Sequence, residues 1–330
     1  MAERLFFGTN TEGVKILERR AGQFQLVGRA FEGIPAGAAA SDPTCGIVYI
    51  GTHEGTYKTA DGGKNWKKLT SHLEHQTAVY LYVDRDSHRV YLGTHPIELY
   101  VSDDHGESWT KINFVEKIPP EIREKWVFHP YPAYGPHIKS IATSQGRLYV
   151  NIEEGWCYRS DDEGESFTPL LWGGLHIDAH VLATHPFNRD VVFSTHAYGA
   201  AKSTDGGESW KDIEDVCSTG IEDYGGGIAV HPRNPNIVVM CTGFQRTAPV
   251  QIQGADAKIF RSTDGGDSWH CVMSGFADRV EAIVFDNQSD PTAYAATEGG
   301  EVLESRDGGE HWQVVARDLG ATYMYGLAVL

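Results

Sequence analysis

A short hairpin motif occurs six times in the 330-residue chain and constrains its fold more than any other feature. Each copy has a hydroxyl residue, an aspartate two positions later, a glycine two positions after that, and an aromatic residue three positions further on. Hydroxyl and carboxylate oxygens bond the amides of a turn, glycine accepts a positive φ, and the aromatic ring packs beneath. The copies begin at Thr59, Ser102, Ser160, Ser203, Ser262 and Ser305. Six stapled hairpins predict a repeat architecture.

The spacing of the motifs gives the size of the repeating unit. Successive aspartates lie 43, 58, 43, 59 and 43 residues apart, which is the length of a four-stranded propeller blade with two longer units. Within a unit, an apolar strand such as 280–285 precedes a second strand such as 292–297 and then the boxed hairpin. Upstream, residues 8–13 mirror residues 51–55, and Arg19 stands where a seventh aspartate would be. The sequence therefore predicts seven blades and a single domain over residues 1–330.

The first unit lacks its own innermost strand. Residues 325–330 resemble the innermost strand at 226–230, so we expect the chain end to supply the missing strand and close the ring. Closure of this kind leaves no open sheet edge. The predicted fold is all-β: a seven-bladed β-propeller of four-stranded blades, closed by the C-terminal strand joining the N-terminal blade.

The motif resembles the Asp box, or BNR repeat, and the whole chain resembles a seven-bladed Asp-box propeller. The resemblance implies that the six aspartates are structural, because in this family the boxes lie on outer hairpins away from the central funnel. It does not imply one function, since similar repeats occur in sialidases, other glycosidases, photosystem II assembly factors and sorting receptors. Sialidases share an arginine-containing F/Y-R-I-P stretch, whereas the nearest segment here, residues 31–35, has no arginine. Sialidase activity is therefore not expected.

Charge and cysteine content narrow the class of partner. The net charge of −17 argues against broad contact with nucleic acid or an anionic membrane surface. The five cysteines are scattered, with no C-x-x-C pair, which indicates reduced thiols. The chain shows no secretory leader and no run of about eighteen apolar residues. We expect a cytoplasmic protein that acts on a small-molecule substrate.

Two long insertions are expected at the end of the ring where loops converge on the axis. They span about 113–136, which is rich in proline and aromatic residues, and about 244–257. The same end should receive the loops before each innermost strand and between the second and third strands. We expect both insertions to rim this face and to cover a pocket there.

Histidines recur at equivalent positions of this end. His53, His95 and His196 align after second strands, and His137 and His180 align at the entries of innermost strands. Neutral imidazole is a common ligand for Zn, Fe, Mn or Cu, and an open position on such an ion activates water or polarises a substrate. The leading hypothesis is a metal-dependent enzyme. Its predicted ligands are His53, His95, His137, His180 and His196, and its predicted catalytic residues are Glu153, Glu298, Tyr224 and Arg279.

Three alternatives stay open at the level of sequence. The histidines could be solvated residues left by blade duplication, or one of them could serve as a metal-free acid or base. The chain could instead be a non-catalytic platform whose acidic, aromatic-rimmed face binds a protein or a glycan. It could also be a metal-free glycoside hydrolase or lyase with paired carboxylates from Glu153, Glu222, Asp223 and Glu298.

Overall fold

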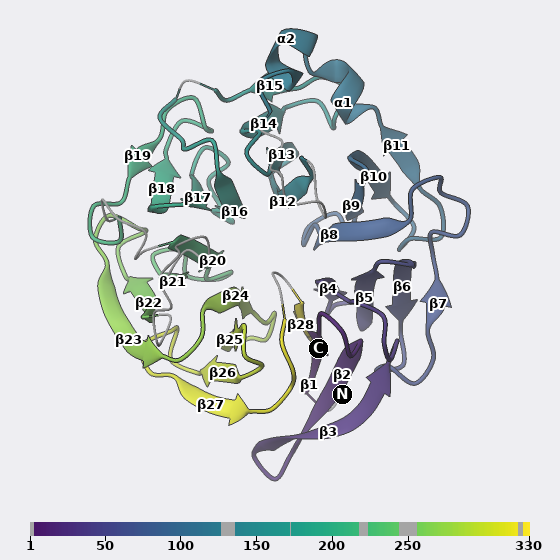
Figure 1. Cartoon of the computed structure of the whole chain (residues 1–330). Helices are drawn as coiled ribbons and strands as arrows, with labels where there is room; N and C mark the ends of the chain where they lie inside the picture. Colours follow the sequence, from purple (N-terminus) through teal and green to yellow (C-terminus); the bar gives the residue numbers. More distant parts are fainter. Residues whose placement is uncertain (1–2, 127–135, 172, 218–223, 244–255, 323–325) are drawn as a thin grey trace.

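The computed structural model is a ring of seven four-stranded antiparallel sheets, which confirms the predicted propeller (Figure 1). It describes residues 3–126, 136–171, 173–217, 224–243, 256–322 and 326–330. Residues 127–135 and 244–255 of the two insertions, together with Glu222, Asp223 and Tyr325, lie outside the described residues.

Each blade is one sheet whose strands run outward from the axis in chain order, with β28 heading blade 1. Blade 1 contains β28 (Leu327–Val329), β1 (Arg4–Gly8), β2 (Val14–Arg20) and β3 (Gln23–Ala30). Blade 2 contains β4 (Ala38–Asp42), β5 (Ile47–Thr52), β6 (Gly55–Thr59) and β7 (Lys67–Lys68). Blade 3 contains β8 (Thr77–Val83), β9 (Val90–His95), β10 (Glu98–Ser102) and β11 (Thr110–Ile112). Blade 4 contains β12 (Ile138–Ser144), β13 (Arg147–Ile152), β14 (Cys157–Ser160) and β15 (Thr168–Pro169). Blade 5 contains β16 (Ala179–Thr184), β17 (Val192–His196), β18 (Gly199–Ser203) and β19 (Lys211–Asp212). Blade 6 contains β20 (Tyr224–Val230), β21 (Val238–Gly243), β22 (Ala257–Ser262) and β23 (His270–Phe276). Blade 7 contains β24 (Val280–Phe285), β25 (Ala293–Thr297), β26 (Val302–Ser305) and β27 (Gln313–Ala316).

The ring has two distinct ends. At the entry end the innermost strands begin, and second strands turn into third strands. At the box end lie the Asp boxes and the turns between first and second strands. This distinction decides which functional groups can meet.

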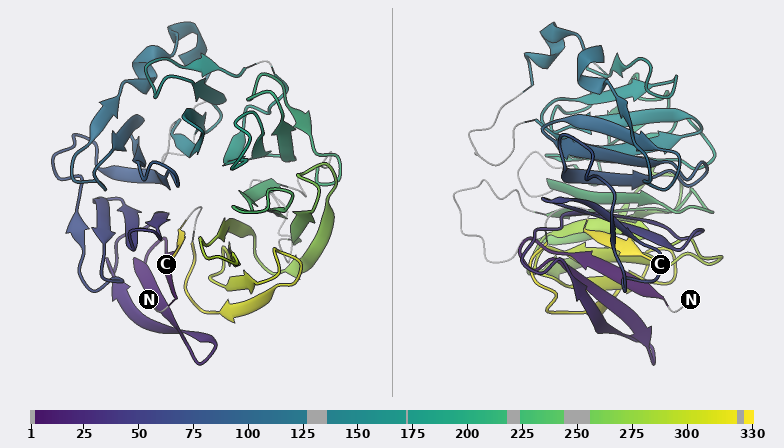
Figure 2. Two further views of the ribbon diagram at one scale, coloured as in Figure 1. Left: turned by 180° about the vertical axis from the view of Figure 1, so that it is seen from behind. Right: turned by 90° about the vertical axis from the view of Figure 1, so that its right-hand side faces the viewer.

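Blade 1 closes as predicted. Strand β28 pairs antiparallel with β1, with Phe6 opposite Ala328. Arg4 and Leu330 also exchange backbone hydrogen bonds of 2.9 Å in both directions, so the two ends of the chain lie side by side (Figure 2). At the position of the missing seventh box, the tight turn Ala21–Gly22, with φ values of 49° and 84°, joins β2 to β3.

The Asp boxes build the outer hairpins by the expected bonds. In blade 4, Ser160 Oγ donates to Asp162 Oδ1 at 2.8 Å and accepts from the Gly164 amide at 2.8 Å. Ser166 Oγ donates to the other carboxylate oxygen of Asp162 at 2.6 Å. Gly164 has φ of 90°, and a Cβ there would lie 3.0 Å from Ile112 in blade 3. The structural interpretation of the six aspartates is confirmed, and the hairpin also packs against the preceding blade.

A basic residue beside the box holds adjacent blades together. Lys58 Nζ, Arg159 Nη1 and Arg261 Nε each donate to a carbonyl in the next blade's box, at 2.9, 2.8 and 2.8 Å. We call this contact the interblade clasp. Between blades 7 and 1 its charge is reversed, because buried Glu304 of β26 pairs with Arg19 of β2. Arg19, which stands where a box would have an aspartate, thus makes the corresponding contact between blades 7 and 1.

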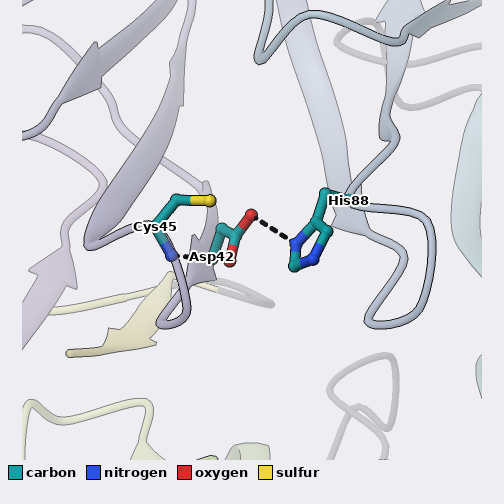
Figure 3. Close-up of side chains that lie close together, drawn as sticks. All are labelled: Asp42, Cys45 and His88. Atoms are coloured by element: carbon teal, nitrogen blue, oxygen red, sulfur yellow. Dashed lines mark hydrogen bonds and ion pairs between the residues drawn. The ribbon is translucent and has the colours of Figure 1, made fainter.

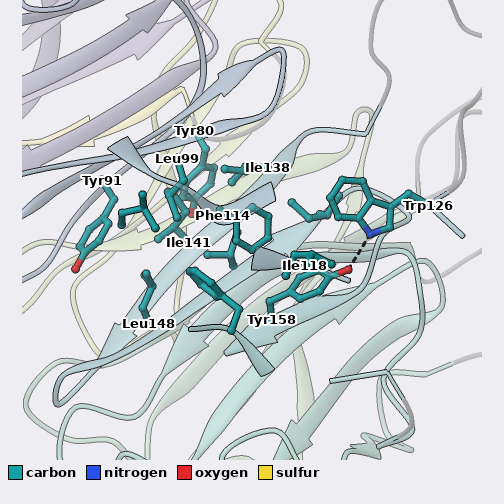
Figure 4. Packing of buried hydrophobic residues seen from close by; sticks show 14 residues of the cluster. Tyr80, Tyr91, Leu99, Phe114, Ile118, Trp126, Ile138, Ile141, Leu148 and Tyr158 are labelled. Carbon is teal, nitrogen blue, oxygen red and sulfur yellow. Dashed lines mark hydrogen bonds between the residues drawn. The ribbon is translucent and has the colours of Figure 1, made fainter. Parts of the chain in front are cut away.

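The first half of the 113–136 insertion does not rim the axis, so that part of the expectation is wrong. It forms two short helices, α1 (Phe114–Lys117) and α2 (Pro120–Arg123), on the outer circumference of the ring (Figure 1). Phe114 and Trp126 are buried in the apolar cluster between blades 3 and 4, where Trp126 Nε1 donates to Tyr158 Oη at 2.7 Å (Figure 4). Burial of these large rings stabilises the contact between blades 3 and 4.

Candidate functional site

Register shifts in the innermost strands deliver charged side chains to the axis. The ladders of β12, β16 and β24 each skip a register step one or two residues after the strand begins. A bulge of this kind re-aims the side chain that leaves the ladder. The residues skipped by these shifts are Lys139, His180, Val181 and Glu281, and all four line one small cavity at the entry end.

Lys139, His180 and Glu281 each pair with a neighbouring acid or base. Lys139 Nζ lies 2.6 Å from Glu153 Oε2, His180 Nε2 lies 3.2 Å from Asp178 Oδ1, and Arg279 Nε lies 3.4 Å from Glu281 Oε1. Tyr224 lies between them: its ring centroid is 4.3 Å from that of His180 and 4.5 Å from the Arg279 guanidinium carbon. We call Lys139, Glu153, Asp178, His180, Tyr224, Arg279 and Glu281 the charged layer.

The charged forms of the layer support one another. Burial opposes the charge of Lys139, yet the adjacent Glu153 carboxylate raises the pKa of this amine above its usual value. Burial likewise opposes the charge of Glu153, but Lys139 and His180 hold its pKa below normal. Burial also acts against ionised Asp178, whose pKa is nevertheless lowered, chiefly by His180. Burial raises the pKa of the Tyr224 phenol, so Tyr224 is neutral at neutral pH.

The ring of His180 is held from both sides. Its Nδ1 lies 2.7 Å from the carbonyl oxygen of Gly225, and since a carbonyl only accepts, Nδ1 carries a proton and donates. Its Nε2 faces Asp178. Both nitrogens of His180 are therefore directed at acceptors, which leaves this ring poorly placed to ligate an ion.

The cavity lined by Lys139, His180, Tyr224, Arg279 and Glu281 of the charged layer is small, at about 10 Å³, enough for about one water molecule. A much larger cavity of about 550 Å³ follows the axis toward the box end and is lined by innermost strands of all seven blades. Val181 lines both cavities. Asp84 and Asp286 line the box end of the large cavity, where Arg85 Nη2 lies 3.5 Å from the Phe285 carbonyl across the ring. The roomier cavity thus lies away from the end at which the sequence placed a pocket.

Four of the residues predicted as catalytic residues or ligands meet in the charged layer: Glu153, His180, Tyr224 and Arg279. His137 is close enough to lower the pKa of Glu153 electrostatically. His53 is exposed on the β5–β6 turn, where its amide donates to the Pro35 carbonyl at 3.2 Å. His95 ends β9 and precedes a cis proline, and Glu298 follows β25, with its amide bonded to the Arg279 carbonyl at 2.8 Å.

The five predicted metal ligands do not assemble into one ligand group. Within the parts of the chain that the structure describes, three groups place three ligand atoms within 4.8 Å of one another, and His196 is the one predicted ligand among their members. Its group also contains Asp212 and Cys217. Burial lowers the pKa of His196 to about 4, so its ring is neutral at neutral pH. A metal-dependent function stays a prediction.

Lys139, Asp178 and Glu281 are the members of the layer that were not predicted from the sequence as catalytic residues or ligands. Lys139 follows Ile138 in a strand that reads as an ordinary alternation, so only the register shift reveals that its side chain reaches the axis. Asp178 lies two residues before His180, and that spacing was an available signal.

The chain resembles known proteins in both sequence and fold. A family model described as photosynthesis system II assembly factor YCF48 matches residues 19–168. The photosystem II assembly lipoprotein Ycf48 of Synechococcus sp. (strain CC9902) is 22% identical over 285 residues, which cover 84% of this chain and 74% of that protein. An anhydrosialidase of Macrobdella decora is 29% identical over 152 residues, but the match spans 42% of this chain and 19% of that protein.

Solved structures show the same fold at low sequence identity. A GH74 xyloglucanase from Xanthomonas campestris aligns with a TM-score of 0.68 and 19% identity, over 96% of this chain and 53% of that one. A structure of YCF48 bound to D1 peptide aligns with a TM-score of 0.56 and 16% identity, over 87% of this chain and 85% of that one.

Blade number, closure and box chemistry define the class: the chain is a seven-bladed BNR-repeat β-propeller. Within that class, the Ycf48 family model matches residues 19–168, and a Ycf48 relative matches along most of the chain. No helix in the described residues is long and apolar enough to cross a membrane.

Proposed function

We propose that the chain is a non-catalytic protein-binding module that takes a basic segment of a partner protein on the entry end of the ring. The observation that carries the proposal is the closure of the charged layer. Its acids and bases pair with one another around space for about one water molecule. General acid–base catalysis needs such groups within reach of a substrate, whereas a layer of mutually paired charges suits recognition of a partner protein at the surface.

The charge of the entry end selects the kind of segment. Glutamates occupy the turns between second and third strands in four blades: Glu12, Glu54, Glu153 with Glu154, and Glu298. Together with the net charge of −17, they favour a cationic ligand. The solved YCF48 complex with D1 peptide, which has the same fold, supports a peptide as the ligand class.

The test uses two fluorescently labelled 12-residue peptides that share their apolar residues, one rich in Lys and Arg and the other rich in Asp and Glu. Fluorescence anisotropy with tag-free protein should show saturable binding of the basic peptide alone, weakening as salt is raised. The E54K/E298K variant should bind at least tenfold more weakly. Its control, E165K/D290K, makes the same charge change at exposed positions of the box end and should bind like wild type. Equal binding of both peptides, or equal loss in the two variants, would overturn the proposal.

A metal-dependent reaction at the entry end is a second candidate. It is favoured by one observation: Glu153, His180 and Tyr224, taken from three different blades, share a single layer. Elemental analysis of tag-free protein tests it, with H137A and E153Q as variants. Bound metal that both variants lose would support this candidate, and metal that both retain would contradict it.

A further inference from the structure

We propose that Asp42, Cys45 and His88 form a binding site for a zinc-type divalent cation that joins blades 2 and 3 at the box end. The three side chains come from two turns between first and second strands, and Asp42 lies between the other two (Figure 3). No residue of this group belongs to the charged layer, so the proposal is independent of the proposed function.

Asp42 is already oriented by its own turn. It ends β4 and is 2% exposed. Its Oδ1 accepts the amides of Thr44 and Cys45 at 3.1 and 3.2 Å. Since these bonds occupy one carboxylate oxygen, Oδ2 remains to face the neighbouring blade. A carboxylate held by outer hydrogen bonds is the usual arrangement of a metal ligand.

His88 meets this oxygen from blade 3. Its Nδ1 lies 2.8 Å from Asp42 Oδ2, so in the cation-free protein Nδ1 donates a proton to the carboxylate. Its backbone has φ of 61°, an unusual conformation for a residue other than glycine, and its amide donates to the Asp84 carbonyl at 3.0 Å. A cation can replace that proton without reversing the ring, because the imidazole can change tautomer and carry its proton on Nε2 while Nδ1 binds the ion.

Cys45 supplies the third donor. Its Sγ, the Asp42 carboxylate and the His88 ring nitrogen lie within 4.8 Å of one another. Tetrahedral zinc ligands at about 2.0–2.3 Å from the ion lie about 3.3–3.8 Å apart, so side-chain movements of about 1 Å bring all three onto one ion. Cys45 is exposed, which leaves access for the cation and a fourth position for water. One thiolate, one imidazole and one carboxylate together favour zinc over calcium or magnesium.

The group around His196 is less suited to a cation. His196 Nδ1 accepts the Tyr198 amide at 3.2 Å, so the neutral ring carries its proton on Nε2, the nitrogen that faces Asp212. An ion on Nε2 would therefore displace the proton from a ring whose other nitrogen is already an acceptor. At His88 the displaced proton can move to Nε2, and no hydrogen bond to Nε2 from the described residues opposes this change of tautomer.

The test titrates tag-free, chelator-treated full-length protein with Co²⁺, whose thiolate charge-transfer band in the near ultraviolet reports Cys–metal bonding, and then displaces it with Zn²⁺. We expect one ion per chain, with the thiolate band present in wild type. C45S should lose the band, and C45S, D42N and H88N should each bind at least tenfold more weakly. Asn is chosen at both positions because it can still accept the turn amides at 42 and tolerates the positive φ at 88.

The matched control is C271S, which removes the other exposed cysteine and should retain the band and the affinity. Zinc should also raise the Tm of wild type more than that of C45S at the same zinc concentration, because an ion that binds only the folded ring stabilises it in proportion to its affinity. Absence of stoichiometric binding, a band that survives in C45S, or a band that is lost instead in C217S would each overturn the proposal.

Discussion

At the scale of single residues, Lys139 is the most demanding member of the charged layer. Its side chain is 4% exposed and has Glu153 as its counter-charge. Removing one partner of a buried ion pair leaves the other charge buried without a counter-charge, which lowers the free energy of unfolding by about 3–5 kcal/mol. The loss is smaller where water reaches the pair, and the Glu153 side chain is 25% exposed. We expect K139M to lower the free energy of unfolding by about 2 kcal/mol and K139M/E153Q to recover most of it. Urea denaturation of wild type, K139M, E153Q and K139M/E153Q measures this cycle, and a K139M variant as stable as wild type would contradict it.

Asp162 gives a prediction in pH. Hydrogen bonds from the Ser166 hydroxyl and amide, followed by that of the Ser160 hydroxyl, lower the pKa of its carboxyl to about 2. A depressed folded pKa contributes stability that is complete above the unfolded value of about 4 and disappears as the pH falls toward 2. The stability difference between wild type and D162N should therefore shrink across this window. Circular dichroism at successive pH values measures it, and S166A, which lacks one donor, should move the window upward.

At the scale of elements, the boxes were predictable because their chemistry is local. Ser160, Asp162 and Gly164 form hydrogen bonds with one another within five residues, so the pattern that makes the hairpin can be recognised in a short stretch of sequence. The alignment of strand entries likewise predicted that His180 and Tyr224 lie together. Contacts between distant turns carry no such record. Asp42 and His88 meet only because two blades stack, and neither turn contains a recognisable ligand motif.

Helix α2 shows a different limit. A segment with Pro119 and Pro120 reads as a loop over the axis, yet proline is well tolerated in the first turn of a helix. Burial of Phe114 and Trp126 against blades 3 and 4 then holds the segment on the outside of the ring. Tertiary burial, which single-sequence patterns do not encode, decided its place.

The reversed clasp between blades 7 and 1 carries a prediction for paired elements. Glu304 is buried and its partners are Arg19 and Arg306. E304K would install the basic residue that other blades have at this position, but against Arg19 instead of a box carbonyl. We expect E304K to lose about 3 kcal/mol of stability, and E304K/R19M to regain part of it because the like-charge contact is gone. Thermal unfolding compares them, and an E304K ring with wild-type Tm would show that the pair does not hold the closure.

At the scale of the whole molecule, stability depends on how the ring is closed. In the natural order, blade 1 combines both ends of the chain, so separating blades 7 and 1 also requires breaking the β1–β28 ladder. Elsewhere, neighbouring blades are linked by chain and by side-chain packing. A permuted chain that joins Leu330 to the N-terminus and opens at exposed Gly33, between β3 and β4, keeps every sheet intact but leaves the boundary of blades 1 and 2 without a covalent or strand-paired link.

We expect this permuted chain to fold into the same ring, because each blade retains its four strands and both faces of its core. Its unfolding in urea should be about tenfold faster, equivalent to ~1.4 kcal/mol, since the unlinked boundary opens without loss of a β ladder. Stopped-flow tryptophan fluorescence measures the rate. The matched control keeps the natural chain order and inserts a linker of the same length at Gly33. That control should unfold at the wild-type rate, because it keeps both the covalent link between blades 1 and 2 and the β1–β28 ladder. Equal unfolding rates for wild type and the permuted chain would show that packing between blades, and not the paired chain ends, limits the opening of the ring.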